Sequence, residues 1–228
     1  MLVRQWSTVD DVRRRMRSMA TVPDWVRRYG PGRRPEQGPL YRSIVVLDVT
    51  GFGRLPNRTQ LLVREVLNTA VRAAFRGSGV RWSWLAVEDR GDGAIILVPA
   101  TVSKVDLLDP VIPNLAAMIR RHNAAAEPGL RIRLRISVHA GEVHRDANGW
   151  VGSDLNVACR LVSSAAVCRY LLRRPAVDVL VVVSDAIYHG VVRHGYRRIS
   201  PATYDAVHVT IKELSTRAWV HVPEPDAD

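Results

Sequence analysis

From residue 41 onward, apolar residues recur at two alternating spacings, and the order of these spacings leaves few folds open. Short runs rich in β-branched residues predict strands, whereas longer segments with apolar residues three and four positions apart predict helices. The order is β-α-β-β-α-β, followed by a helix, a strand and a closing hairpin. It predicts an α+β sandwich in which helices cover one face of a mostly antiparallel sheet. Strands are predicted at residues 43–49, 82–87, 94–98, 131–140, 177–183, 206–214 and 218–222, and helices at residues 57–75, 115–126 and 155–172.

The first 40 residues differ from the rest of the chain in charge. They carry nine arginines against four acidic residues, so nine minus four gives a local net charge of +5. Residues 30–35 (GPGRRP) are a predicted linker because glycine and proline interrupt regular structure. We predict a basic N-terminal extension and linker over residues 1–40, one domain over residues 41–223 and a tail over residues 224–228. The extension is either a solvated basic tail or a docking arm.

The composition limits the classes of partner. The net charge of +11 attracts polyanions, which include nucleic acids, anionic membranes and nucleoside triphosphates. Aromatic residues make up only 6% of the chain and form no stacking platform with basic residues, which disfavours nucleic-acid binding. No apolar run approaches the roughly 20 residues that a membrane span needs, and the N-terminus lacks the apolar core of a secretory signal. Cys159 and Cys168 form neither a disulfide framework nor a metal motif, so we expect a cytoplasmic protein.

Two aspartates beside predicted strands are candidate metal ligands. Asp48 ends a buried strand, where a carboxylate needs a partner or a cation, and Asp92 lies in the turn of a predicted hairpin. If the two carboxylates are close they repel each other, and a divalent cation resolves this conflict. Taken singly, Asp92 is also an ordinary turn residue and Asp48 a capping residue.

Asn156 and Arg160 are four residues apart in a predicted helix, so they lie on one face of it. An amide and a guanidinium one turn apart can position a ribose and neutralise charge on a phosphorus transition state. Considered alone, the pair is also typical of a surface or packing pair.

Four segments in this order resemble the motifs of the class III adenylyl/guanylyl cyclase catalytic domain, over residues 41–223. The segments DVTGFG and RGDG are similar to the motifs that carry the two metal ligands of that family, here Asp48 and Asp92. ISVHAGEV at residues 136–143 is similar to G-I-H-x-G, and GSDLNVACRL at residues 152–161 is similar to G-x-x-V-N-x-A-x-R-L. The resemblance implies a ferredoxin-like βαββαβ sandwich of the class III cyclase type, with additional C-terminal strands.

The resemblance also implies a reaction, in which a nucleoside triphosphate is converted to a 3′,5′-cyclic nucleotide and pyrophosphate. Two Mg²⁺ or Mn²⁺ ions would be held by Asp48, Asp92 and the Val49 carbonyl. Asn156 would orient the ribose, and Arg160 would stabilise the transition state. The family's shared sites imply a homodimer in which the aspartates and the Asn156/Arg160 pair of one site come from different subunits. The phosphates would be bound by Gly51, Phe52, Gly53 and, in a looser alignment, Lys212.

The residues expected to contact the base depart from the family pattern. Glu88 stands four residues before Asp92, where adenylyl cyclases have lysine and guanylyl cyclases have glutamate, and Gly149 stands seven residues before Asn156. An adenine pocket is therefore disfavoured. The chain is also similar to the single-domain pyrimidine cyclases of bacterial antiphage (Pycsar) systems, which implies UTP or CTP as substrate and cyclic UMP or cyclic CMP as second messenger. GTP is the alternative substrate.

Two other classes of function remain open. The first is a cyclase-like sensor that binds a nucleotide without converting it, although the presence of both aspartates, the Asn and the Arg disfavours it. The second is a nucleic-acid-binding protein that depends on the basic charge.

Overall fold

The computed structural model describes residues 38–224, so the predicted extension lies outside the described residues except for its last three positions. Within the described part, the strands form one eight-stranded sheet in the order β2-β3-β1-β4-β6-β8-β7, with the short β5 pairing with β4. Among these, β4 and β6 run parallel, and the other pairs are antiparallel. The mostly antiparallel sheet is thus confirmed. The strands are β1 (Leu40–Val49), β2 (Ala86–Asp89), β3 (Gly93–Pro99), β4 (Leu134–Arg145), β5 (Trp150–Val151), β6 (Val179–Ser184), β7 (Tyr204–Ile211) and β8 (Leu214–His221).

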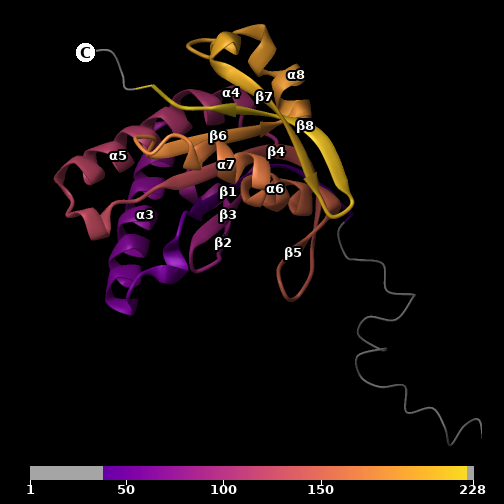
Figure 1. Ribbon diagram of the computed structural model, residues 1–228. Coiled ribbons are helices and arrows are strands. Elements are labelled where there is room, and N and C mark those ends of the chain that lie inside the picture. The colour runs from indigo at the N-terminus through magenta and orange to yellow at the C-terminus, as the bar shows by residue number, and fades with distance from the viewer. Residues whose placement is uncertain (1–37, 225–228) are drawn as a thin grey trace, which may run out of the picture. The chain divides into compact units, whose positions relative to one another are not determined.

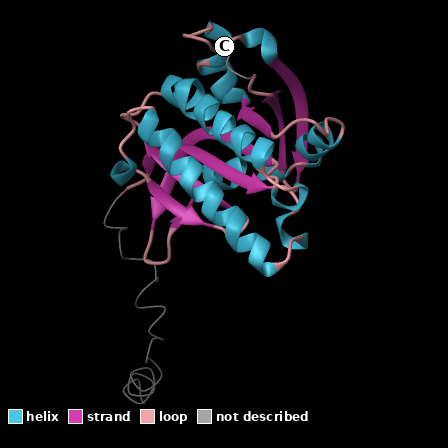
Figure 2. Ribbon diagram, turned by 90° about the vertical axis from the view of Figure 1, so that its left-hand side faces the viewer, coloured by secondary structure: helices cyan, strands magenta, loops and turns pink. Residues whose placement is uncertain are grey.

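Helices cover both faces of the sheet, so the prediction of a single covered face is wrong (Figure 1). Alternation along β1 explains this, because Val45 and Leu47 pack in the core with α3 and α5, whereas Ile44 and Val46 pack against α6. Figure 2 shows long helices lying across the strands. The helices are α3 (Asn57–Gly77), α4 (Lys104–Asp106), α5 (Ile112–Ala125), α6 (Ser153–Ser163), α7 (Ala165–Leu172) and α8 (Asp185–Gly190).

The predicted order β-α-β-β-α-β is present as β1-α3-β2-β3-α5-β4, with shifted boundaries. The predicted strand at 82–87 begins instead with the 3₁₀ helix Trp82–Trp84, because Trp82 packs edge-on against Phe75 of α3. The predicted strand at 131–140 starts later, at Leu134. Both backbone groups of Ile132 are bonded to the side chain of Asn123, at 2.7 and 2.8 Å, instead of to a neighbouring strand.

The single helix predicted at 155–172 is two helices, broken at Ser164. Ser164 is extended, and its hydroxyl accepts a hydrogen bond from the Val167 N–H, which makes it the N-cap of α7. The stretch Ser153–Leu172 is the one described segment long and apolar enough to meet a length-and-hydropathy criterion for a membrane span. That criterion is weak evidence here, because apolar residues of both helices, such as Leu161 and Val167, are buried in the core against the sheet.

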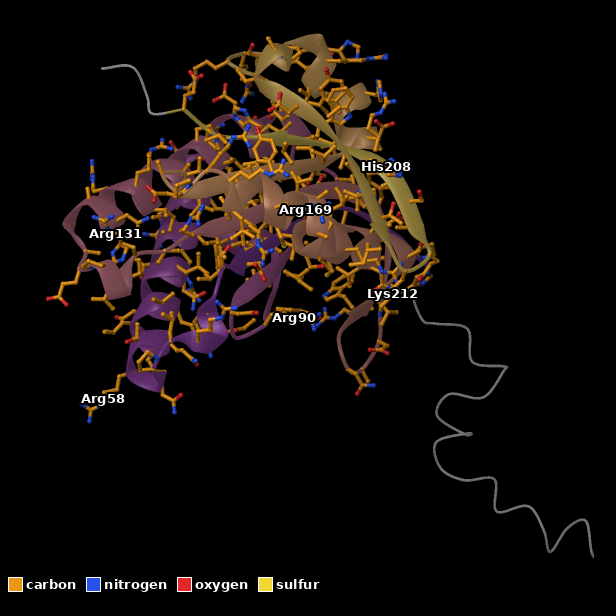
Figure 3. All side chains as sticks on the ribbon, in the orientation of Figure 1. Arg58, Arg90, Arg131, Arg169, His208 and Lys212 are labelled. Carbon is orange, nitrogen blue, oxygen red and sulfur yellow. The ribbon has the colours of Figure 1, made fainter. Side chains whose placement is uncertain are left out.

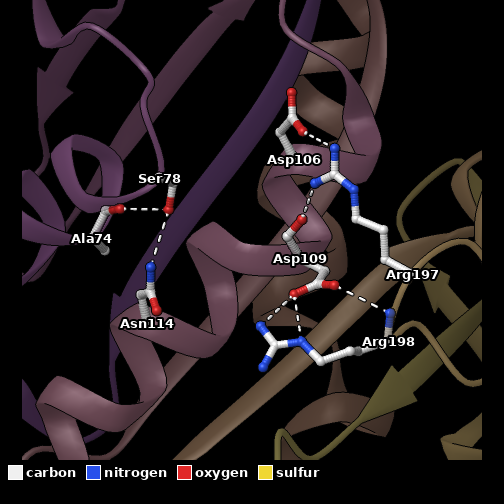
Figure 4. A network of polar contacts seen from close by, with 7 residues as sticks. All are labelled: Ala74, Ser78, Asp106, Asp109, Asn114, Arg197 and Arg198. Atoms are coloured by element: carbon white, nitrogen blue, oxygen red, sulfur yellow. Dashed lines mark hydrogen bonds and ion pairs between the residues drawn. The ribbon is translucent and has the colours of Figure 1, made fainter.

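The C-terminal strands form the predicted closing hairpin, with its turn at Lys212 and Glu213. A polar network fastens the segment before this hairpin to the region that precedes α5 (Figure 4). The Asp109 carboxylate is 5% exposed and accepts hydrogen bonds from the backbone and the guanidinium of Arg198. Arg197 donates to the Asp109 carbonyl and pairs with Asp106. A buried carboxylate is thereby supplied with several donors.

Candidate active site

The last residues of β1 place Asp48 on the α6 side of the sheet. Asp48 is two residues beyond Val46, so alternation along the strand directs both side chains to the face that packs against α6. It pairs with Gly93 on β3 and with Arg135 on β4. Its side chain is 21% exposed. The predicted buried strand therefore ends in a carboxylate that is only partly solvated.

Asp92 lies beside Asp48, as the hypothesis of a shared site requires. The Asp92 carbonyl accepts a hydrogen bond from the Val49 N–H at 2.8 Å, and the next residue, Gly93, pairs with Asp48. A Cβ atom at Gly93 would lie 1.9 Å from the Leu47 carbonyl oxygen, so only glycine permits this approach of the two strands. The two aspartates are held side by side by backbone pairing.

Arg135 is a site residue that the sequence analysis missed. Its Nε donates to Asp48 Oδ2 at 2.8 Å, and its Nη2 contacts the same oxygen. Burial raises the pKa of Asp48, the Arg135 charge and hydrogen bond lower it, and the Asp92 charge raises it, with a net upward shift. The sequence signal was the alternation in RIRLRIS, which places Arg135 opposite the apolar side chains of its strand.

A cavity of about 460 Å³ separates the aspartates from α6. Asp48 and Asp92 line one side of it, and Asn156, which is exposed, lines the α6 side. Arg90, from the turn between β2 and β3, and Cys159 also face this cavity. Three of the predicted site residues are thus brought to one space.

Arg160 lies one turn beyond Asn156 and is not part of the lining of that cavity. Its guanidinium pairs with Glu213 at 2.7 Å, at the turn of the β7–β8 hairpin. Lys212 precedes Glu213 in this turn and has a φ of 51°, an uncommon value for a residue other than glycine. The structure therefore brings Arg160 near the Lys212 turn, and Figure 3 shows Lys212 at the end of the β7–β8 hairpin.

The two predicted base-contact residues lie together in a neighbouring cavity of about 480 Å³. Glu88 Oε1 accepts the Trp150 N–H at 3.0 Å, and a Cβ at Gly149 would lie 2.7 Å from the same oxygen. Glu88 Oε2 accepts a hydrogen bond from Arg90 Nη2 at 2.7 Å. Both carboxylate oxygens of Glu88 are thus occupied by protein donors.

The predicted phosphate loop follows β1 directly. Gly51 has a φ of 76° and precedes the 3₁₀ helix Phe52–Arg54, which includes Gly53. Phe52 is 9% exposed and packs in the core with α3, which fixes the loop at the end of the strand. The positive φ at Gly51 explains a glycine there.

The aspartate pair fits a Mg²⁺- or Mn²⁺-nucleotide site. No group of three or more His, Cys, Asp or Glu side chains in residues 38–224 is arranged to hold a metal ion. Mg²⁺ is usually bound by one or two carboxylates together with substrate phosphates, instead of by a full set of protein ligands. Asp48 and Asp92 supply that number, and the mutual effect of their charges favours a bound cation.

Comparison with known proteins gives the fold. The sequence matches neither a protein-family model nor a curated protein. The structure is similar to the guanylyl cyclase Cya2, with 17% identity over 83% of this chain and 96% of that chain and a TM-score of 0.57. It is similar to an adenylate/guanylate cyclase/hydrolase from Silicibacter pomeroyi, with 18% identity, 82% and 99% coverage and a TM-score of 0.58. A dimeric guanylyl cyclase domain from the fungus Blastocladiella emersonii is also similar, with 17% identity, 81% and 97% coverage and a TM-score of 0.51.

The fold is that of a class III nucleotidyl cyclase catalytic domain. The expected α+β architecture is confirmed, and at identities of this size the likeness concerns the fold alone. In this cyclase-like fold, the two aspartates lie at the adjoining ends of β1 and β3 and face α6.

Proposed function

We propose that the chain is a nucleotidyl cyclase, which converts a nucleoside triphosphate to a 3′,5′-cyclic nucleotide and pyrophosphate. The observation that carries this proposal is the adjacent pair Asp48 and Asp92, which line an open cavity on a cyclase fold. A retained pair of carboxylates and a retained amide and guanidinium favour catalysis over nucleotide sensing.

The chain's own residues would act by binding, orienting and charge compensation. Asp48, Asp92 and the Val49 carbonyl would hold two Mg²⁺ or Mn²⁺ ions, which supply charge neutralisation at the phosphates and a lowered pKa of the ribose 3′-hydroxyl. Asn156 would orient the ribose, and Arg160 would stabilise the charge on the α-phosphoryl oxygens.

The proposed assembly is a homodimer with two shared sites. Asn156 faces the aspartates across a cavity within one chain, whereas Arg160 is directed to the β7–β8 turn, so one chain does not gather the full set. A second copy would bring its own Asn156 and Arg160 to Asp48 and Asp92. The backbone N–H groups of Gly51, Phe52 and Gly53, together with Lys212, would bind the phosphates.

The proposed substrate is a pyrimidine triphosphate, UTP or CTP, with cyclic UMP or cyclic CMP as a second messenger in antiphage defence. Glu88 extends to the position where a side chain at Gly149 would lie, which reduces the room between the two hairpins for a base. GTP is the second candidate, because guanylyl cyclases are among the similar structures.

The test is an assay of the purified chain with Mn²⁺ and each of the four triphosphates, with the products identified by mass spectrometry. We expect a cyclic product and pyrophosphate from UTP or CTP, and none from Asp92→Ala.

An independent measurement is the melting temperature. Mn²⁺ with a non-cyclisable 3′-deoxynucleotide, at a ligand concentration of about 100 times Kd, should raise the melting temperature of the wild type by several degrees. The increase should be much smaller in Asp48→Asn. Asp205→Asn, on β7, is the matched control. Binding without pyrophosphate release would identify a sensor.

A further inference from the structure

Arg90 and Glu88, both of the β2–β3 hairpin, differ in the cavity that they line. Arg90 lines the cavity that contains Asp48, Asp92 and Asn156, whereas Glu88 lines the neighbouring one. Figure 3 places Arg90 between the β2–β3 hairpin and the β5 region, in agreement with its share of a cavity that Trp150 also lines. Its side chain is 51% exposed, so it is accessible to a ligand.

Glu88 connects Arg90 to β5 through two hydrogen bonds. One carboxylate oxygen accepts the Trp150 N–H of β5, and the other accepts a hydrogen bond from Arg90. The Glu88 side chain is 24% exposed, and both of its oxygens are bonded to the protein. These two contacts fix the orientation of the carboxylate between β5 and Arg90, although each oxygen can accept one more hydrogen bond.

The charges of both residues reach the wall of the cavity. Burial raises the pKa of Cys159 on α6, the Arg90 charge lowers it and the Glu88 charge raises it. Arg90 therefore acts electrostatically on the space between the aspartates and α6.

A guanidinium offers only donors, in a planar fork. Among residues 38–224, only one of the five N–H groups of Arg90 donates to a protein partner, so the others remain available to a ligand. Guanine presents the acceptors O6 and N7 side by side, cytosine presents O2 beside N3, and uracil presents carbonyls at O2 and O4. Adenine has no carbonyl, and its N7 lies beside an amino donor. A fork of donors fits the adjacent acceptors of guanine and cytosine. On uracil, whose N3–H donor lies between the two carbonyls, it can donate to one carbonyl oxygen, and on adenine it meets the amino group.

We infer that Arg90, held in place by Glu88, recognises the base of the substrate, and that this base carries a carbonyl oxygen. This inference rests on the proposed function, which supplies the nucleotide. It assigns Arg90 as the specificity-determining residue and Glu88 as its positioning residue.

The test measures the dissociation constants of the four 3′-deoxynucleoside triphosphates by calorimetry with Mn²⁺, because these analogues cannot cyclise. The wild type should bind the uridine, cytidine or guanosine analogue more tightly than the adenosine analogue. Arg90→Gln should weaken the preferred analogue by about 5- to 150-fold, as expected for one bidentate arginine–base contact, and should leave the adenosine analogue nearly unchanged. Arg90→Lys keeps the charge without the fork and should lose most of the preference as well. Glu88→Gln should lower the preference by a smaller factor than Arg90→Gln does.

Arg64→Gln is the matched control. Arg64 pairs with Asp89 of the same hairpin but does not line the cavity, so its removal should leave the preference unchanged. An equal loss for all four analogues in Arg90→Gln would make Arg90 a phosphate contact and overturn the inference, and so would an unchanged preference. A wild type that binds these analogues selectively without cyclising the parent triphosphates would refute the proposed activity alone. A wild type that binds none of them would refute both proposals.

Discussion

Single atoms decide the geometry of the aspartate pair. The distance of 1.9 Å between a hypothetical Cβ at Gly93 and the Leu47 carbonyl oxygen leaves no room for any other residue at this position. The neighbouring contacts of Asp48 then set its charge, because Arg135 favours the ionised form while burial and Asp92 oppose it.

Gly93→Ala should destabilise the protein by at least about 2 kcal/mol, because the added methyl group meets backbone and the strands must separate. The measurement is the free energy of unfolding from urea titration. Gly129→Ala is the control, since a Cβ there meets nothing within 4 Å. Equal stabilities of the two variants would contradict the packing at β1 and β3.

His139 gives the stability a pH dependence of known sign. It is 8% exposed and lies between Ser184 and Asp154, with its ring nitrogens at 2.8 and 3.3 Å from their oxygens. Burial lowers its pKa, and Asp154 offsets this only in part. As the pH falls through the unfolded value of about 6.5, the unfolded chain binds the proton first, so stability decreases below this pH.

The unfolding free energy of the wild type should therefore be lower at about pH 5.5 than at about pH 7.5, with a slope for this group of at most about 1.4 kcal/mol per pH unit. His139→Gln should reduce that difference. Part of it should remain, because burial also lowers the pKa of His221. An identical pH dependence in the variant would exclude His139 as a cause.

At the scale of elements, the turn between β7 and β8 contacts α6 through an ion pair. Glu213 in this turn pairs with Arg160 on α6. The pKa of Glu213 is lowered first by a backbone hydrogen bond and then by the hydrogen bond from Arg160. In the proposed reaction, a triphosphate that binds Arg160 would compete with this carboxylate.

Glu213→Gln should lower the KM for the triphosphate by up to about fivefold, because a competing anion is removed from Arg160 at an exposed site. The measurement is the KM at fixed Mn²⁺, with the dissociation constant of the 3′-deoxy analogue as a second readout. Glu65→Gln, on α3, should leave both values unchanged. A raised KM would show that Glu213 positions Arg160 for its task.

The elements also show what periodicity can predict. The βαββαβ order followed from the spacing of apolar residues, because strands and helices with one buried face leave clear patterns. The break at Ser164 left no such pattern, since apolar spacing continues across it and only a side-chain cap marks the new helix. The second covered face was missed although β1 carries its signal, because a continuous apolar run is typical of a strand that is buried on both faces.

At the scale of the whole molecule, the sequence predicted which residues share a site better than it predicted the contacts between their side chains. Asp48, Asp92 and Asn156 were predicted for one site and line one cavity. The contacts of Arg135 with Asp48 and of Arg90 with Glu88 were not predicted, because they depend on strand register and on turn geometry. Glu88 was predicted for base contact from its position alone, and its bond to the Trp150 N–H joins segments 62 residues apart.

The proposed homodimer can be tested by mixing two inactive variants, because only a shared site would recover activity. Asp92→Ala and Arg160→Ala should each be inactive, and an equal mixture after subunit exchange should regain about a quarter of the wild-type activity. Half of randomly formed dimers are mixed, and each mixed dimer has one complete site of two. The measurement is pyrophosphate release, with exchange verified by native mass spectrometry. Proven exchange without recovery would exclude shared sites.

The glycine between two strands has a mechanical consequence. Asp48 lies on β1, and Asp92 ends the β2–β3 turn, where its carbonyl accepts the Val49 N–H and the next residue, Gly93, pairs with Asp48, so the turn is fastened to the sheet at the acidic pair. In the proposed cyclase, control of turnover would then come from the groups that meet this pair from outside it: a second chain, the Glu213 turn, or the nucleotide itself.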